Sequence, residues 1–334
     1  MSGRVPLRGV RAGPVFLAAA LAAAAASAGE PPAGYLFAHM TRADYGRLHY
    51  AASTNGLHWT PLNGGRRVLE SYRGHPDITR MPDGRWVLLG NHPDRGDVRM
   101  WTSSNLVDWI HLRDFTADMS AFPGFEPPGK WHGAPKMVYD DEARRYVMTF
   151  HFSNRPGRRE EPEYYWSGMR TFVVTSPDLA AFTPARRLFD WDFATIDVIL
   201  RRDAGRWFAI VKDERHPDSG AATGKTIRIA ESSGGPAGPW SAPGPSLTPN
   251  FREAPMLIPR PDGRGWYLYF EQYPGISYGL VTAPGLGGPW TEVPAAEYRT
   301  PPGVRHGCMV AVTREELAGL RAAFAGPPPV RPGQ

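Results

Sequence analysis

The sequence has one cysteine, few lysines and almost no helical periodicity. Because Cys308 is alone, no intramolecular disulfide can form, so a hydrophobic core must supply the stability. Beyond the first thirty residues, apolar residues recur at helical spacing only from Arg314 to about Phe324, after Thr313 as N-cap. In the same part of the chain no apolar run reaches the length of a membrane-spanning helix. These absences predict an all-β domain without a membrane partner.

The kind and placement of the positive charges disfavour nucleic-acid binding. Only four of the 38 basic residues are lysines, and no block of Lys and Arg is interleaved with aromatic residues. The formal charge is +5, and three of these charges belong to Arg4, Arg8 and Arg11. The remaining chain is close to neutral, so no nucleic-acid partner is expected.

The first residues have the pattern of a secretory signal peptide. The three arginines precede an apolar run from Val15 to about Ala25, and a small-residue exit, Ala26-Ser27-Ala28, follows. We expect residues 1–28 to be removed and the protein to reach the periplasm or the medium. Residues 29–325 are then one catalytic domain, and residues 326–334 are a Pro-rich disordered tail.

A strand pattern recurs along the chain at intervals of about 60 residues. Each repeat has a strand, a tight turn with Asp or Gly, an aromatic strand, and a third strand that ends in a Ser/Thr-rich turn before another aromatic residue. The aromatic strands are 85–89, 145–150, 206–211 and 265–270. Such a period is typical of propeller blades, whereas a β-sandwich would not explain it.

The two ends of the chain carry the parts of one further repeat. Residues 35–38 and 49–53 resemble the later strands, and residues 305–312 resemble the missing first strand. Pairing these strands would close the ring and remove exposed sheet edges. The sequence therefore predicts a five-bladed β-propeller closed by its N- and C-terminal strands.

Acidic residues begin three of the first strands, which line the central channel of a propeller. These residues are Asp77, Asp197 and Glu253. Carboxylates around one cavity shift each other's pKa values, as acid/base cleavage of an acetal requires. Singly, Asp77 could end a loop, Asp197 could bind backbone amides, and Glu253 could pair with Arg252. Their equivalent places in three repeats favour a shared catalytic role.

Four short motifs resemble glycoside hydrolase family 43, in the same order and over nearly the whole mature chain. They are Gly74-His75-Pro76-Asp77-Ile78, Thr195-Ile196-Asp197, Arg252-Glu253-Ala254-Pro255 and Arg305-His306-Gly307. The resemblance implies an inverting mechanism with Asp77 as general base, Glu253 as general acid, and Asp197 tuning the acid. It also implies a structural calcium ion near His306, held through water, and no required cofactor.

Two features depart from the family pattern. The usual Pro after the base Asp is missing, and the second repeat reads Trp131-His132-Gly133-Ala134-Pro135, with two residues inserted. Related five-bladed clans include enzymes in which a His serves as the acid, so His132 is an alternative acid. Its preferred role is a hydrogen bond to sugar hydroxyls.

Other residues near the channel strands are candidates for substrate binding. Trp131, Phe251 and Tyr273 could stack on a sugar ring. His75 and His306 are expected to orient the substrate rather than to react. The segment from Arg155 to Trp166 either covers the site or is an ordinary surface loop.

The sequence thus predicts an exported inverting glycoside hydrolase that acts on oligosaccharides or polysaccharides of plant or microbial origin. The preferred activities are those of an α-L-arabinofuranosidase or a β-xylosidase. Two alternatives remain: a propeller that only binds glycans, and a hydrolase of neoagaro-oligosaccharide type with a His acid.

Overall fold

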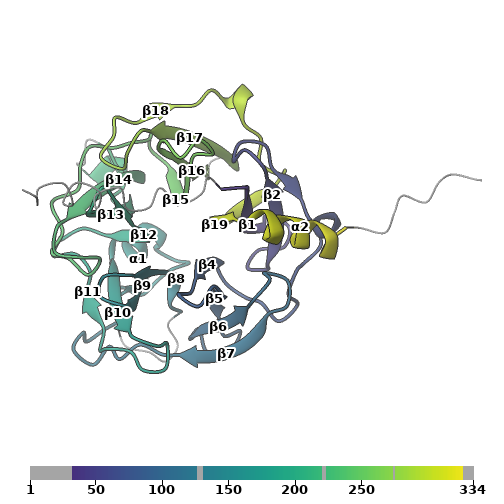
Figure 1. The fold of residues 1–334 in the computed structure, drawn as a ribbon. Helices are drawn as coiled ribbons and strands as arrows, with labels where there is room; N and C mark the ends of the chain where they lie inside the picture. The colour runs from purple at the N-terminus through teal and green to yellow at the C-terminus, as the bar shows by residue number, and fades with distance from the viewer. Residues whose placement is uncertain (1–31, 126–130, 220–222, 274, 326–334) are drawn as a thin grey trace, which may run out of the picture. The chain divides into compact units, whose positions relative to one another are not determined.

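Five small antiparallel sheets stand around a common centre in the computed structural model of the protein (Figure 1). The structure describes residues 32–125, 131–219, 223–273 and 275–325. The predicted signal peptide and the Pro-rich tail lie outside these residues. Within them the five-bladed propeller is confirmed.

Each blade is one sheet, and the inner strand comes first in four of them. Blade 1 contains β4 (Asp77–Arg80), β5 (Trp86–Asn91), β6 (Val98–Ser103) and β7 (Ile110–Phe115). Blade 2 contains β8 (Gly133–Asp140), β9 (Arg145–Ser153), β10 (Met169–Ser176) and β11 (Arg186–Arg187). Blade 3 contains β12 (Thr195–Asp203), β13 (Arg206–Asp213) and β14 (Thr226–Ser232). Blade 4 contains β15 (Arg252–Pro259), β16 (Trp266–Gln272), β17 (Ser277–Ala283) and β18 (Thr291–Glu292).

Blade 5 joins the two ends of the chain, as the sequence predicts. Its strand order is β19 (Val304–Val312), β1 (Gly34–Thr41), β2 (His49–Ser53) and β3 (Thr60–Pro61). Strands β19 and β1 are antiparallel and pair from Gly34 opposite Val312 to Thr41 opposite Val304. The inner strands contact one another in the order β4, β8, β12, β15, β19 and back to β4, which closes the ring.

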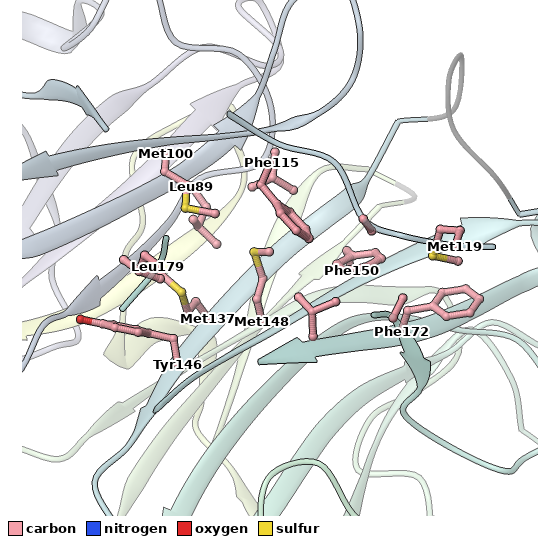
Figure 2. Close-up of a cluster of buried hydrophobic side chains, with 14 of the residues drawn as sticks. Leu89, Met100, Phe115, Met119, Met137, Tyr146, Met148, Phe150, Phe172 and Leu179 are labelled. Atoms are coloured by element: carbon pink, nitrogen blue, oxygen red, sulfur yellow. The ribbon is translucent and has the colours of Figure 1, made fainter. Parts of the chain in front are cut away.

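The hydrophobic core is divided among the boundaries between blades. Figure 2 shows the cluster between blades 1 and 2, where Leu89 and Met100 of blade 1 meet Met148, Phe150 and Phe172 of blade 2. Four more clusters fill the other four boundaries. Because β side chains alternate between faces, each sheet packs on both neighbours and the blades hold each other in place.

The Ser-containing turns after the third strands share one geometry. The Ser103 hydroxyl accepts a hydrogen bond from the Leu106 amide at 2.9 Å, and the Ser176 hydroxyl accepts one from the Leu179 amide at 2.8 Å. Both leucines have φ of 64° and are buried. The hydroxyl satisfies a turn amide while the leucine fills the core, which explains why this motif recurs.

Two α-helices flank the sheets. Helix α2 (Arg314–Ala323) begins at the predicted N-cap Thr313, which forms a capping box with Glu316. Helix α1 (Pro162–Ser167) was not predicted, and the 3₁₀ segments η1 (Asn63–Gly65), η2 (Pro217–Ser219) and η3 (Ala295–Glu297) are short. Among the described residues, no helix has the length and hydrophobicity needed to cross a membrane.

Candidate active site

Four inner strands bulge at the same level of the channel. The register of β8, β12 and β15 with their neighbours shifts between Gly133 and Lys136, Ile196 and Ile199, and Glu253 and Met256. In β19 the pairing skips one residue in the same way. The extra residues have positive φ and are Ala134 (37°), Asp197 (53°), Ala254 (48°) and His306 (30°). A bulge turns side chains out of the regular alternation, here toward the end of the channel.

The strand register separates two layers of residues along the channel. The cavity layer consists of Gly74, His75, Gly133, Ala134, Ile196, Asp197, Glu253, Ala254, Arg305 and His306. The lower layer consists of Asp77, Lys136, Ile199, Met256 and Cys308. Pro76 corresponds to Pro135 and Pro255, so His75, and not Asp77, occupies the blade 1 position equivalent to Asp197.

A cavity of about 780 Å³ opens over the cavity layer. From the predicted site, its lining includes His75, Trp131, His132, Asp197, Glu253 and His306. A separate cavity of about 440 Å³ lies at the other end of the inner strands, and it is lined by none of the predicted site residues. The first cavity is therefore the candidate active site.

Glu253 is held by three cationic partners. One carboxylate oxygen lies 3.1 Å from Lys212 Nζ, and the other lies 3.2 Å from Arg305 Nη2 and 3.3 Å from His306 Nε2. Burial alone would raise the pKa of Glu253, but His306 and Lys212 bring it well below its usual range. Glu253 is ionised in this arrangement.

His306 is the hydrogen-bond partner of Glu253 with a raised affinity for a proton. Burial alone would lower the pKa of His306, but the neighbouring Glu253 carboxylate raises it above its ordinary value. The His306 backbone amide donates to Glu271 at 3.0 Å, and Arg305 also pairs with Glu271. Glu253 and His306 therefore form a pair at the floor of the cavity in which a shared proton favours the imidazole.

Asp197 stands beside this pair on the next blade. Its carboxylate accepts a hydrogen bond from the Ala254 amide at 3.2 Å, which ties it to the bulge that carries Glu253. No ion pair to Asp197 occurs among the described residues. The structure therefore brings Asp197 and Glu253 together, as predicted.

His75 stacks on His306 across the cavity floor. The ring centroids are 4.4 Å apart with an interplanar angle of 28°, and Tyr45 packs edge-on against both rings. Nε2 of His75 is 3.1 Å from the Tyr45 hydroxyl. Burial and the neighbouring His306 hold the pKa of His75 well below its usual value, so this imidazole is neutral.

Asp77 does not join the other two carboxylates, contrary to the sequence prediction. It accepts a hydrogen bond from the Met137 amide at 2.8 Å and lies 3.7 Å from Lys136 Nζ. Burial raises the pKa of Asp77, and Lys136 only partly offsets this rise. The space beside it is only about 10 Å³, so no sugar can reach it. The geometry gives no support to Asp77 as the general base.

His132 lines the cavity, but both of its ring nitrogens are bound to the backbone, which argues against the prediction that it binds or protonates a sugar. Nδ1 lies 3.0 Å from the Gly96 carbonyl oxygen, and Nε2 accepts from the Ala117 amide at 3.1 Å. These partners require Nδ1 to carry the hydrogen, leaving no ring nitrogen for substrate. Burial lowers the pKa of His132 to about 4, so the ring stays neutral near pH 7.

Of the three predicted stacking residues, only Trp131 lines the cavity. It is 46% exposed and presents a large apolar face to the mouth. Phe251 and Tyr273 contact each other edge-on at 6.1 Å and are outside the cavity lining. Tyr273 instead covers Lys212, whose Nζ lies 4.7 Å from the ring centroid. The prediction that Phe251 and Tyr273 stack on the substrate is wrong for this arrangement.

The segment from Arg155 to Trp166 does border the site. Arg155, Arg158, Tyr165 and Trp166 all line the cavity, and the last two belong to helix α1. The sequence leaves two interpretations open, a segment that covers the site and an ordinary surface loop. The structure supports the first.

The side chains around His306 do not by themselves offer the ligands that a calcium ion prefers. Glu253, Glu271 and His306 have ligand atoms within 4.8 Å of one another. Calcium prefers six to eight oxygen ligands, whereas this set offers two carboxylates and an imidazole nitrogen. Both carboxylates are also already paired, Glu253 with Lys212 and Arg305, and Glu271 with Arg305. The side chains alone thus form a balanced ionic cluster and not a set of calcium ligands, so an ion here would depend on water for its ligands.

The charged residues that support Glu253 were not predicted from the sequence. Lys212 is buried and bridges Glu253 and Glu214, with Nζ 2.8 Å from the Glu214 carboxylate. The sequence does contain a signal for them, because the charged run Lys212-Asp213-Glu214 directly follows an apolar strand. Charged residues that are buried in this way need partners of opposite charge. His151, also buried in the cavity wall, carried no comparable signal.

The comparisons with known proteins agree with this fold. Residues 30–318 match a family model described as a probable glycosyl hydrolase domain, related to glycosyl hydrolase family 43. No curated protein matches the chain significantly. Solved structures that match include an α-L-arabinofuranosidase from Lactobacillus brevis, with 16% identity, a TM-score of 0.50, and coverage of 66% of this chain and 72% of that one.

Two further matches cover about half of the longer proteins concerned. An exo-β-1,3-galactanase from Phanerochaete chrysosporium has 15% identity and a TM-score of 0.51, with coverage of 69% of this chain and 51% of that one. A mutant of the GH43 protein BlXynB from Bacillus licheniformis has 14% identity and a TM-score of 0.53, with coverage of 74% and 47%. At these identities the likeness concerns the fold.

Proposed function

This chain belongs to the glycosyl hydrolase domains related to family 43, and we propose that it cleaves glycosidic bonds with inversion in the cavity over Asp197 and Glu253. The single observation that carries the proposal is the placement of these two carboxylates in one cavity, backed by buried cationic partners. Acetal hydrolysis needs a proton for the leaving oxygen and a base for water.

The acid is the pair of Glu253 and His306. The proton resides on His306, 3.3 Å from the Glu253 carboxylate, in the absence of substrate. When a leaving oxygen approaches Glu253, His306 supplies the proton that Glu253 passes on. Asp197 positions Glu253 through the Ala254 amide.

The base is His75. It occupies the position of blade 1 that is equivalent to Asp197 and His306. With the Nε2 hydrogen donated to the Tyr45 hydroxyl, Nδ1 of the neutral ring is the nitrogen that accepts a proton from water. This role for His75, and that of His306 in the acid pair, replace the expectation that both residues only orient the substrate. In the family pattern the base precedes a Pro, and here His75 precedes Pro76. His75 thereby replaces Asp77 in this role.

The preferred substrates are α-L-arabinofuranosides and β-xylosides, as the resemblance to family 43 implies. The predicted signal peptide supports action in the periplasm or the medium. A glycan-binding propeller without activity is the second candidate, because Glu253 is neutralised by three cations and blade 1 offers no acid at the cavity layer.

Leaving-group dependence separates the proposed roles. Wild-type protein is tested on 4-nitrophenyl glycosides and on the matching unactivated disaccharides, beside Glu253→Gln and His75→Gln proteins. The Glu253→Gln protein should lose less activity on the 4-nitrophenyl glycosides than on the disaccharides, because 4-nitrophenol needs little help from an acid to leave. The His75→Gln protein should lose activity on both substrate classes equally. Full activity of the Glu253→Gln protein would contradict the proposal, and binding without any turnover by the wild type would favour the second candidate.

A further inference from the structure

In the segment that covers the cavity, residues 155–166, the positive and the negative side chains lie in different places. Residues 155–163 contain three arginines and three glutamates. Arg155 and Arg158 line the cavity, whereas Arg159 and all three glutamates are outside its lining. Glu163 instead pairs with Lys225 at 3.1 Å. Only positive charge from this segment is therefore presented to the substrate.

Neither of these cavity arginines is neutralised by the protein. Among the described residues, no carboxylate lies within ion-pair distance of Arg155 or Arg158. Arg158 is an exposed residue, and its guanidinium carbon lies 5.4 Å from the Trp166 ring centroid and 5.9 Å from that of Tyr165. Such aromatic contacts hold the guanidinium in place and leave its donors free.

A third arginine reaches the cavity from the segment before β4. Arg73 donates to the Tyr72 and Glu70 carbonyl oxygens, the former at 2.7 Å, and it has no carboxylate partner in the described part of the chain. Arg305, by contrast, is compensated by Glu253 and Glu271. Against three uncompensated arginines the cavity offers one carboxylate outside an ion pair, that of Asp197.

We propose that the substrate carries an anionic group, a uronate carboxylate or a sulfate ester, which Arg155 and Arg158 bind at the mouth of the cavity. This rests on the proposed function in that the same cavity binds the scissile glycoside. A guanidinium binds a carboxylate or sulfate through paired charge-assisted hydrogen bonds, whereas a neutral hydroxyl gives a weaker and less directed contact. Asp197 and Glu253 lie deeper and leave the mouth positive.

The test measures glycan binding by the protein on an array that pairs neutral oligosaccharides with their uronate-bearing and sulfated counterparts. A double variant, Arg155→Gln with Arg158→Gln, is compared with Arg159→Gln, which removes one charge from the same segment outside the cavity. All are prepared in the wild-type and Glu253→Gln backgrounds, so that turnover does not remove the bound glycan.

We expect the bound glycans to be anionic, with affinity for them at least about tenfold lower in the double variant and unchanged in Arg159→Gln. Affinity should also fall between low and high salt. A preference for uronates or for sulfates tells the two sources apart. Equal binding of neutral glycans, or an equal loss in Arg159→Gln, would overturn the inference. Anionic binding without hydrolysis would contradict the proposed hydrolase and leave this inference standing.

Discussion

The cavity layer and the lower layer of the channel are about two residues apart along the same strands, yet the surroundings of their charged side chains differ. In the cavity layer Glu253 is surrounded by cations and still faces open space. In the lower layer Asp77 and Lys136 are buried beside a cavity of only about 10 Å³. A carboxylate in a propeller channel therefore becomes a site residue through its register, and a shift of two residues changes it into a structural ion.

The largest expected effect is on activity in the cavity layer. Glu253→Gln removes the group that passes the proton to the leaving oxygen, so kcat on unactivated oligosaccharides should fall by about a thousandfold or more. Circular dichroism and thermal unfolding of the same sample control for misfolding. Turnover within tenfold of the wild type would contradict the assignment.

The matching change in the lower layer should act on stability. Asp77→Asn leaves the Lys136 charge buried without its partner, which should lower the free energy of unfolding by about 3–5 kcal/mol. Urea unfolding measures this loss. Adding Lys136→Met removes the unpaired charge and should restore part of the stability, whereas an unchanged unfolding midpoint in Asp77→Asn would show that the buried pair has little effect.

Buried neutral histidines should make the fold sensitive to acid. Burial lowers the pKa values of His39, His132 and His151 to about 4, below the ordinary value of 6.5. Between these values the unfolded chain binds protons that the folded chain does not. The contribution is therefore complete above pH 6.5 and is lost as the pH falls toward 4, by at most about 3 kcal/mol for each residue.

The His132→Asn protein tests this account at one position. The free energy of unfolding should depend on pH less steeply between pH 4 and 6.5, by about one proton, although the variant is less stable overall. An unchanged slope would mean that His132 is protonated in the folded protein.

The smallest effect is expected at the mouth of the cavity. Trp131 is 46% exposed, so Trp131→Ala should leave the melting temperature unchanged and raise KM about tenfold by removing a stacking surface. Phe251→Ala is the matched control, because Phe251 is outside the cavity lining and should leave KM unchanged. An equal rise of KM in both variants would contradict this difference.

The repeat pattern sufficed to predict the five blades, because the aromatic strands, their turns and the matching end fragments are local features of the sequence. Asp197, Glu253, His75, His306 and Trp131 could likewise be placed at the cavity. The position of Asp77 could not, because a bulge adds a residue to the other inner strands and shifts their register. The one signal in the sequence is the alignment of Pro76 with Pro135 and Pro255, which places His75 and not Asp77 opposite Asp197.

The misassigned His132, Phe251 and Tyr273 share another cause. Whether a polar or aromatic side chain faces substrate depends on its long-range partners, here the Gly96 and Ala117 backbone for His132 and Lys212 for Tyr273. The positive charge at the mouth of the cavity was equally hard to predict, because residues 29–334 are close to neutral overall and only the fold separates their charges.

The most direct test of the central claim is the turnover number of the Asp77→Asn protein on a glycoside that the wild type cleaves, at a temperature where both proteins are folded. We predict a kcat within about fivefold of the wild type, because Asp77 has no access to the cavity. A loss as large as that of Glu253→Gln would contradict the separation of the two layers and return the role of base to Asp77.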